Sequence, residues 1–102
     1  MYNEHTTFEF DREKEKRNIR KHGIAFEAAK EVFFDPDVIS APDLKHSRKE
    51  ERWYAVGRIG DGSIATVWYT MRDNRCRIIG AGRFRKGRKE YEKRKIAGSR
   101  QT

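Results

Sequence analysis

Residues 52–83 read RWYAVGRIGDGSIATVWYTMRDNRCRIIGAGR. Two short polar sequences, Gly-Asp-Gly at 60–62 and Asp-Asn at 73–74, divide this stretch into three segments, and both are typical of hairpin turns. In the first two segments, bulky side chains occupy both alternating sets of positions. One face of a sheet built from them would therefore pack on helices, and the other would be partly covered or form a site. The stretch predicts an antiparallel β-meander over residues 52–59, 63–71 and 75–83.

The residues before the meander begin with a short strand and a surface helix. Residues 7–10 (Thr-Phe-Glu-Phe) alternate polar and apolar side chains, which favours a strand. Asp11 is a typical N-cap and Gly23 a typical left-handed stop, so a helix is expected over residues 12–22. Ile19 is the only aliphatic or aromatic side chain in that helix, so we expect a surface helix held by Ile19, by the stems of charged side chains and by i,i+4 pairs such as Glu13 with Arg17.

The remaining segments complete a mixed architecture. A second, amphipathic helix is expected from about residue 25 to 34, followed by a strand at 38–41 and a polar loop at 43–50. A basic helix is expected from 87 to about 96, with a flexible tail over about 97–102. Strands and helices are segregated along the chain, which indicates an α+β fold. At 102 residues the chain is expected to form a single domain.

Composition excludes several classes of protein. Charged residues make up 39% of the chain and hydrophobic residues 35%. No apolar run approaches the roughly 18 residues that a membrane span needs, and the first residues lack the pattern of a signal peptide. The single cysteine, Cys76, rules out an internal disulfide, and no Cys/His spacing is typical of a zinc finger. The composition therefore predicts a cytoplasmic protein with no membrane partner.

The positive charge of the chain is concentrated in its last third. Residues 72–102 contain 12 Lys and Arg against 3 Asp and Glu, a net charge of +9. Residues 1–71 contain 12 Lys and Arg against 13 Asp and Glu, a net charge of −1. Such a basic segment attracts polyanions, either nucleic acid or an acidic protein. The alternative interpretation is a solvated basic helix that aids solubility.

Two clusters in the first two thirds of the chain could carry chemistry. Lys21 and His22 end the first expected helix, where the helix dipole favours a protonated His and a Lys would help bind phosphate. The alternative there is ordinary capping by basic residues. A cluster of His46, Glu50, Glu51 and Arg52 lies where the polar loop enters the meander, and a His with a carboxylate could act as a general acid–base pair. The alternative for this cluster is a solvated loop.

The basic last third supplies candidate phosphate-binding residues. By strand parity, Arg75, Arg77 and Arg83 fall on one face, opposite Cys76 and Ile78. Arginines fit the charge that develops on a pentacovalent phosphorus during phosphodiester cleavage. The candidates for RNA contact in this region are Arg75, Arg85, Lys86, Arg88 and Tyr91.

Tyr91 has two interpretations, since it could stack on a base or donate a proton, or instead dock the terminal helix on the sheet. The sequence shows no Ser/His/Asp signature, Gly-rich phosphate loop or cluster of metal-ligating carboxylates, so no metal or cofactor is expected. A nuclease working without metal would use the 2′-hydroxyl of RNA to attack the neighbouring phosphate. DNA lacks that hydroxyl, so this mechanism selects RNA.

Short motifs along the chain form an ordered series: FEFD at 8–11, NIRKHG at 18–23, AFEAA at 25–29, VFFDP at 32–36, HS at 46–47, EER at 50–52, RIIGA at 77–81 and YE at 91–92. In order and spacing this series closely resembles toxins of the BrnT family over about residues 8–92. The family motif Arg-Ile-Ile-Ser-Ala-Arg has Gly80 in place of Ser, and Gly82 displaces its last Arg to Arg83. A β-bulge at Gly82 would still let Arg83 reach the site.

The resemblance implies a RelE-like fold and a ribonuclease activity that arrests growth. It also implies a cognate BrnA-like antitoxin with a ribbon-helix-helix DNA-binding domain. The complex would repress its own operon, so the toxin would meet operator DNA only through the antitoxin.

The resemblance, together with the basic last third, implies a metal-independent endoribonuclease toxin of a type II toxin–antitoxin system. Its predicted catalytic residues are Lys21 and His22 near the scissile phosphate, Glu51 or His46 in proton transfer, and Arg52, Arg77 and Arg83 as stabilisers of the transition state. The alternative function is a non-catalytic basic module that binds nucleic acid or an acidic partner protein. Expression would discriminate the two, because a host cell tolerates a passive binder but not a toxin.

Overall fold

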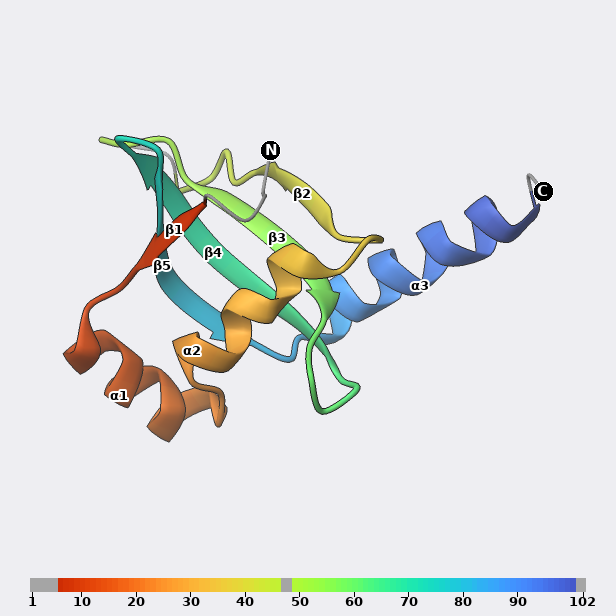
Figure 1. Ribbon diagram of the computed structural model, residues 1–102. Coiled ribbons are helices and arrows are strands. Elements are labelled where there is room, and N and C mark those ends of the chain that lie inside the picture. The colour runs from red at the N-terminus through yellow and green to blue at the C-terminus, as the bar shows by residue number, and fades with distance from the viewer. Residues whose placement is uncertain (1–5, 47–48, 101–102) are drawn as a thin grey trace.

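The computed structural model describes residues 6–46 and 49–100 and shows one five-stranded sheet with helices (Figure 1). The sheet order is β1-β5-β4-β3-β2, and β1 runs parallel to β5 while all other neighbours are antiparallel. The strands are β1 (Thr7–Glu9), β2 (Ile39–Pro42), β3 (Trp53–Arg58), β4 (Ile64–Arg72) and β5 (Arg75–Gly82). The helices are α1 (Arg12–His22), α2 (Phe26–Ala29), the 3₁₀ helix η1 (Lys30–Phe34) and α3 (Arg85–Arg100). The predicted α+β class and the meander β3-β4-β5 are confirmed.

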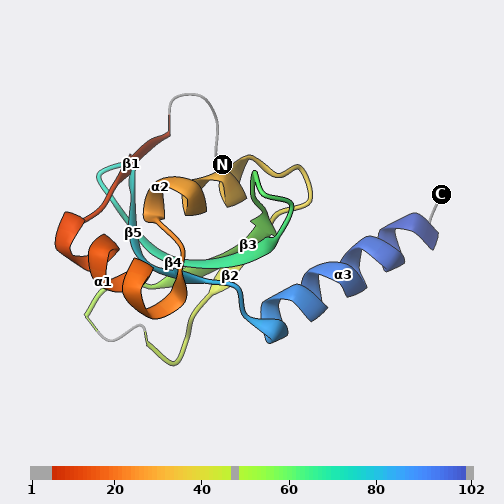
Figure 2. The ribbon, with the colours of Figure 1, turned by 90° about the horizontal axis from the view of Figure 1, so that it is seen from below.

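One face of the sheet carries the main core. Alternate residues of the meander strands point to α2 and η1, and they bury a cluster that includes Ala55, Val67 and Tyr69 with Phe26 and Phe33 of the helices. Figure 2 shows α2 on this side of the sheet and the loop after β2 on the other. The expectation that one face packs on helices is therefore correct.

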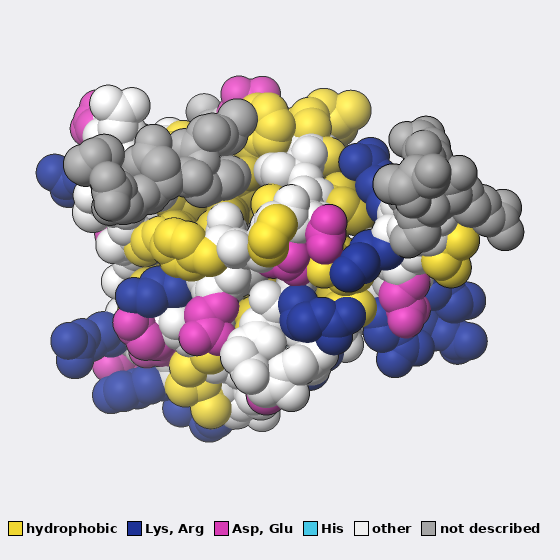
Figure 3. Space-filling view, turned by 45° about the vertical axis from the view of Figure 1, so that its right-hand side comes forward, with side chains coloured by type: hydrophobic (Ala, Val, Ile, Leu, Met, Phe, Trp, Pro, Cys, Tyr) yellow, Lys and Arg dark blue, Asp and Glu magenta, His cyan; other side chains and the backbone are white. Residues whose placement is uncertain are grey.

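The opposite face, called the second face here, is only partly covered. At one end α3 packs through Tyr91 against Ile39, Val56 and Ile64. Gly87 lets α3 approach this closely, because a Cβ there would overlap the hydroxyl of Thr66. Beyond this contact α3 projects away from the sheet, and Figure 3 shows basic side chains gathered around it on the right-hand side.

The first helix has the predicted ends but a different anchor. The Asp11 carboxylate accepts hydrogen bonds from the amides of Glu13 and Lys14, and Gly23 ends α1 with a φ of 69°. Ile19, however, is 43% exposed and does not hold the helix to the body. That part is played by Asn18, which is 9% exposed. The sequence argument named Ile19, charged-residue stems and pairs within the helix, whereas the side chain of Asn18 holds the helix by hydrogen bonds to backbone groups outside it.

Several boundaries and one helix type differ from the sequence expectations. The second helix is α-helical only over Phe26–Ala29 and then tightens into η1. The second strand is Ile39–Pro42, one residue later than expected, and includes the proline at its edge. The terminal helix begins at Arg85 and continues to Arg100, into the stretch where a tail was expected. Residues 101–102 of that tail lie outside the described residues.

A β-bulge in β5 changes which face its arginines occupy. Trp68 of β4 pairs with Gly80 and Tyr69 pairs with Ile78, so Ile79 is left without a partner. Cys76 and Ile78 before the bulge and Ala81 after it are all buried in the main core. The alternation therefore changes phase at residue 79, and Arg83 does not share a face with Arg75 and Arg77. The bulge expected at Gly82 lies three residues earlier.

Within residues 6–46 and 49–100, no helix has both the length and the apolar character to span a bilayer.

Candidate functional site

His46 and Asp43 form a fixed pair in the loop between β2 and β3. His46 Nδ1 lies 2.8 Å from Asp43 Oδ2, and the His46 amide donates to the Asp43 carbonyl at 3.3 Å. The Asp43 amide in turn donates to the carbonyl of Arg52 at 2.7 Å, which ties the loop to the start of β3. The imidazole is 61% exposed and the carboxylate only 12%. When Nδ1 donates to the carboxylate, Nε2 is left as the basic nitrogen on the exposed side.

This pair lines a cavity of about 310 Å³ on the second face of the sheet. Five segments form it: α1, the loop after β2, the entry to β3, and the facing residues of β4 and of β5. The principal lining residues are Lys14, Asp43, His46, Arg52, Trp68 and Gly80. Gly80 pairs with Trp68, and a Cβ at Gly80 would lie 3.8 Å from the indole, so the ring lies over this glycine. The arrangement combines an oriented imidazole, two cations and an aromatic surface.

Asn18 positions α1 beside this cavity. Its side-chain amide donates to the carbonyls of Ala81 and Ile24, each at 2.9 Å, and its oxygen accepts from the Ala81 amide at 3.2 Å. β1 pairs with β5 only as far as Arg77. Beyond that point, the side chain of Asn18 provides hydrogen-bond partners for the backbone amide and carbonyl of Ala81. Lys14, one helical turn before Asn18, reaches the cavity because the helix lies along this edge.

The arginines of β5 before the bulge are paired with acid. Arg77 Nη1 lies 2.9 Å from Glu9 Oε2, and Arg75 Nη1 lies 3.5 Å from Glu9 Oε1. The hydrogen bond from Arg77 holds the pKa of the Glu9 carboxyl below its usual value. Glu50, a member of the predicted acid–base cluster, accepts two hydrogen bonds from Arg72, at 2.7 and 2.9 Å. Much of the charge of these strands is therefore neutralised locally, and Arg77 is not among the residues that line the cavity.

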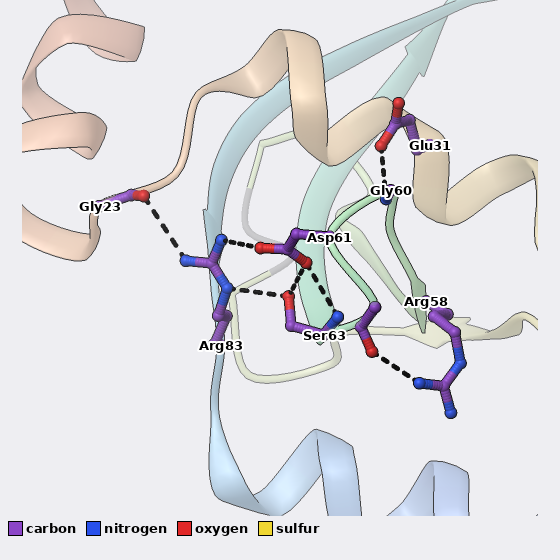
Figure 4. A network of polar contacts seen from close by, with 8 residues as sticks. Gly23, Glu31, Arg58, Gly60, Asp61, Ser63 and Arg83 are labelled. Atoms are coloured by element: carbon purple, nitrogen blue, oxygen red, sulfur yellow. Dashed lines mark hydrogen bonds and ion pairs between the residues drawn. The ribbon is translucent and has the colours of Figure 1, made fainter.

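Arg83 has a different setting from the other predicted catalytic arginines. It donates to Ser63 Oγ at 2.9 Å and to Asp61 Oδ2 at 3.0 Å, and it lies 3.5 Å from the Gly23 carbonyl (Figure 4). It thereby joins the β3–β4 turn to the end of α1. Hydrogen bonds from the hydroxyl and amide of Ser63, with Arg83 beside them, lower the pKa of Asp61 to about 2.

The predicted catalytic residues therefore form two groups. His46 and Arg52 share the cavity, whereas Lys21, His22 and Arg83 lie around the end of α1. Exposed Glu51 and the Glu9-paired Arg77 are outside both groups. Two aromatic contacts connect the groups. The His22 ring lies 5.3 Å from that of Phe84, and Phe84 lies 5.3 Å from Trp68, which lines the cavity.

Tyr91 is the docking residue of α3 in this structure. Its side chain is 1% exposed and its hydroxyl donates to Asp35 Oδ2 at 2.6 Å. Burial and the hydrogen bond to Asp35 raise the pKa of Tyr91 to about 12. A ring in this position cannot stack on a base, so the interpretation of Tyr91 as an RNA-contacting residue is corrected to the docking alternative. Arg85 and Arg88 line a separate cavity, and Lys86 is exposed nearby.

Sequence reasoning did not identify Lys14, Asp43, Trp68 or Phe84 as site residues. Lys14 is one of several lysines on a polar helix, and only the position of α1 beside β5 distinguishes it. Asp43 carried a usable signal, because an Asp three residues before a His in a polar loop can orient the imidazole. In the part of the chain that the structure describes, no three His, Cys, Asp or Glu residues gather as a metal-binding group.

Comparison with known proteins identifies the class to which this protein belongs. Residues 10–90 match a family model described as "Ribonuclease toxin, BrnT, of type II toxin-antitoxin system". A ribonuclease toxin of this kind acts on RNA and is paired with an antitoxin. The chain belongs to the BrnT family, as the series of motifs indicated.

The fold is similar to a crystal structure of the Brucella abortus ribonuclease toxin BrnT. The TM-score is 0.61 at 22% sequence identity, over 76% of this chain and 94% of that chain. This likeness supports the mixed α+β architecture with a five-stranded sheet. A search of the curated proteins finds no match.

Proposed function

We propose that this BrnT-family toxin cleaves RNA in the cavity of the second face, as an endoribonuclease that needs no metal ion. The observation that carries the proposal is the His46–Asp43 pair at 2.8 Å, held in one cavity with Arg52, Lys14 and Trp68. An oriented imidazole supplies a general base, and adjacent cations stabilise a charged phosphorus intermediate. A RelE-like architecture, which the resemblance of the motifs implies, is part of this proposal.

The proposed reaction is an internal transesterification. His46 Nε2 accepts the proton of the ribose 2′-hydroxyl, and the 2′-oxygen forms a bond to the adjacent phosphorus. Arg52 stabilises the negative charge that gathers on the non-bridging oxygens. The bond from phosphorus to the 5′-oxygen then breaks, and that oxygen takes a proton from the Lys14 ammonium. The products are a 2′,3′-cyclic phosphate and a 5′-hydroxyl, with the indole of Trp68 available to stack on a base.

His46 is the base in this proposal in preference to Glu51, because Asp43 fixes its ring and it lines the cavity. Lys21, His22, Arg77 and Arg83 take supporting roles in it, either binding RNA beside the cavity or fixing the fold around it. Arg75, Arg85, Lys86 and Arg88 are proposed to contact RNA outside the cavity.

The proposed partner is a cognate BrnA-like antitoxin with a ribbon-helix-helix domain. The basic surface around α3, visible in Figure 3, suits an acidic segment of such a protein. Complex formation would block RNA access by covering this surface. Operator DNA would be contacted through the antitoxin, and the toxin would act in the cytoplasm.

Two histidine variants test the location of the active site. In a chelating buffer, His46→Asn should lower kcat on a defined RNA by about 100-fold or more, because it removes the proton acceptor. His22→Asn is the matched control, since it removes an imidazole that lies beyond Phe84 and should change kcat by less than about threefold. If His22→Asn abolishes cleavage while His46→Asn does not, the active site lies at the end of α1 and the proposal is wrong.

A further inference from the structure

A second cavity is lined by Phe84, whose ring contacts Trp68 of the His46 cavity. It has a volume of about 410 Å³ and lies between the β3–β4 turn and the first turn of α3. We call it the arginine cleft, because its charged lining residues are Arg58, Arg83, Arg85, Arg88 and Glu92. The lining holds four guanidinium groups and the Glu92 carboxylate, and the Asp61 carboxylate pairs with Arg83 beside it, so a net positive charge remains in a small space.

Two of these guanidinium groups are already held in place. Arg58 Nη1 donates to the Gly62 carbonyl at 2.6 Å, and its guanidinium carbon lies 5.9 Å from the centre of the Tyr91 ring. Arg83 is held by Ser63 and Asp61 in the same turn (Figure 4). Groups that are fixed before binding lose less conformational entropy when a ligand arrives.

The other two arginines belong to the first turn of α3. Arg88 is 3.8 Å from Glu92, a loose pair, and Arg85 has no ion-pair partner among the residues that the structure describes. Because these residues lie at the N-terminal end of a 16-residue helix, the positive end of its dipole faces the cleft. Charge, preorganisation and dipole all favour an anion with several oxygen atoms, such as a phosphate diester.

Phe84 connects the arginine cleft to the His46 cavity. It lines the cleft, and its ring lies 5.3 Å from that of Trp68, which lines the other cavity. The ring also lies tightly on the backbone, because a Cβ at Gly82 would overlap it. A basic surface interrupted by stacking aromatic rings is the usual construction of a site for single-stranded nucleic acid.

We propose that the arginine cleft is a phosphate-binding subsite for single-stranded RNA, which holds the strand as it leaves the His46 cavity over Trp68 and Phe84. The inference rests on the proposed function for the choice of RNA as the ligand. Its chemistry is independent of the cleavage step, since the cleft binds phosphates that do not react. It adds affinity and fixes the direction in which the strand lies.

The double variant Arg85→Ala/Arg88→Ala tests this subsite by binding alone. The probe is a fluorescent 2′-O-methyl RNA of about ten nucleotides, which lacks the attacking hydroxyl and so cannot be cleaved. We expect about tenfold weaker binding near 0.1 M salt. The slope of log affinity against log salt should fall by about 1.4, or roughly 0.7 for each lost phosphate contact to a single strand. Circular dichroism and thermal unfolding of each variant show whether it has kept the fold.

The matched control is Lys89→Ala/Lys93→Ala, which removes two charges from the same helix outside the cleft. It should weaken binding by less than about threefold. Equal losses for the two pairs would mean that α3 acts only through diffuse charge, and the subsite would be refuted. It would also be refuted if the arginine pair governed binding of a polyglutamate peptide and left RNA affinity unchanged, since the cleft would then serve an acidic protein.

Turnover separates this inference from the proposed function. With a cleavable RNA, the arginine variant should raise KM about tenfold and leave kcat unchanged, because it removes binding common to the ground and transition states. If the unmodified protein cleaves no RNA, the proposed function fails. The 2′-O-methyl binding measurement still decides whether the arginine cleft binds RNA.

Discussion

One buried amide connects α1 to the sheet at the scale of single residues. Asn18 donates to the carbonyls of Ala81 and Ile24 and accepts a hydrogen bond from the Ala81 amide, and it is almost fully buried. Without it, the amide and carbonyl of Ala81 would lose their partner inside the protein. Leaving buried polar groups unsatisfied costs more than the hydrogen bonds themselves contribute. Asn18 is therefore expected to contribute more to stability than the apolar residue beside it.

The substitution Asn18→Ala should lower the free energy of unfolding by about 2–4 kcal/mol, since it leaves several backbone groups unpaired. Urea unfolding followed by circular dichroism measures this change. Ile19→Ala is the control, and it should cost less than about 1 kcal/mol because the side chain is 43% exposed. A larger loss for Ile19→Ala than for Asn18→Ala would contradict the assignment of Asn18 as the anchor.

Single residues were predictable from the sequence where their partners are local. Asp11 and Gly23 could be placed at the ends of α1 because capping involves only neighbouring residues. Asn18 could not be identified as an anchor, because its partner Ala81 is 63 residues away. His46 was recognisable by its type and loop, whereas its proximity to Lys14 depends on how α1 lies against β5.

At the scale of elements, a polar clamp holds the β3–β4 turn against the end of the sheet. Arg83 connects β5 to Ser63 and Asp61 of the turn and approaches Gly23 at the end of α1. Asp61 also accepts from the amide and hydroxyl of Ser63. The ionised carboxylate is therefore the centre of the clamp, and its protonation should loosen the turn.

The pH dependence of stability should report this clamp. The folded-state pKa of Asp61 is lowered to about 2, so its stabilisation is present above about pH 4 and is lost as the pH falls towards 2. Asp61→Asn should lower Tm at pH 6 and make the fall in Tm between pH 4 and 2 shallower. Asp73→Asn, in the β4–β5 turn, is the control and should leave the fall in Tm between pH 4 and 2 unchanged. If Tm falls equally between pH 4 and 2 in Asp61→Asn and in the unmodified protein, the clamp does not stabilise the fold.

The helices and strands were largely predictable, but the face of the sheet to which each residue of β5 points was not. Alternation and turn residues located the meander, since both are properties of adjacent residues. The bulge at Ile79 arises from pairing with β4, and counting along β5 alone placed Arg83 on the wrong face. The close approach of η1 to β3 was likewise not predictable, since it depends on Gly57, which leaves room for Val32 of η1.

At the scale of the whole molecule, one face of the sheet carries the core that stabilises the fold, and the other carries the cavities proposed to bind RNA. The face towards α2 and η1 carries the main core, and the second face carries the His46 cavity, the contact of α3 and the arginine cleft. The concentration of charge in residues 72–102 indicated a polyanion partner from composition alone. Composition could not show that α3 is docked through Tyr91, nor that Arg83, Arg85 and Arg88 border a cleft that Phe84 connects to the His46 cavity.

The products of RNA cleavage test the central claim most directly. The purified, antitoxin-free toxin is incubated with a defined RNA in excess chelator, and the ends of the fragments are identified by mass spectrometry. The account predicts discrete fragments with a 2′,3′-cyclic phosphate on one side of the cut and a 5′-hydroxyl on the other. Fragments with a 3′-hydroxyl and a 5′-phosphate, or cleavage that appears only when a divalent metal ion is added, would contradict it.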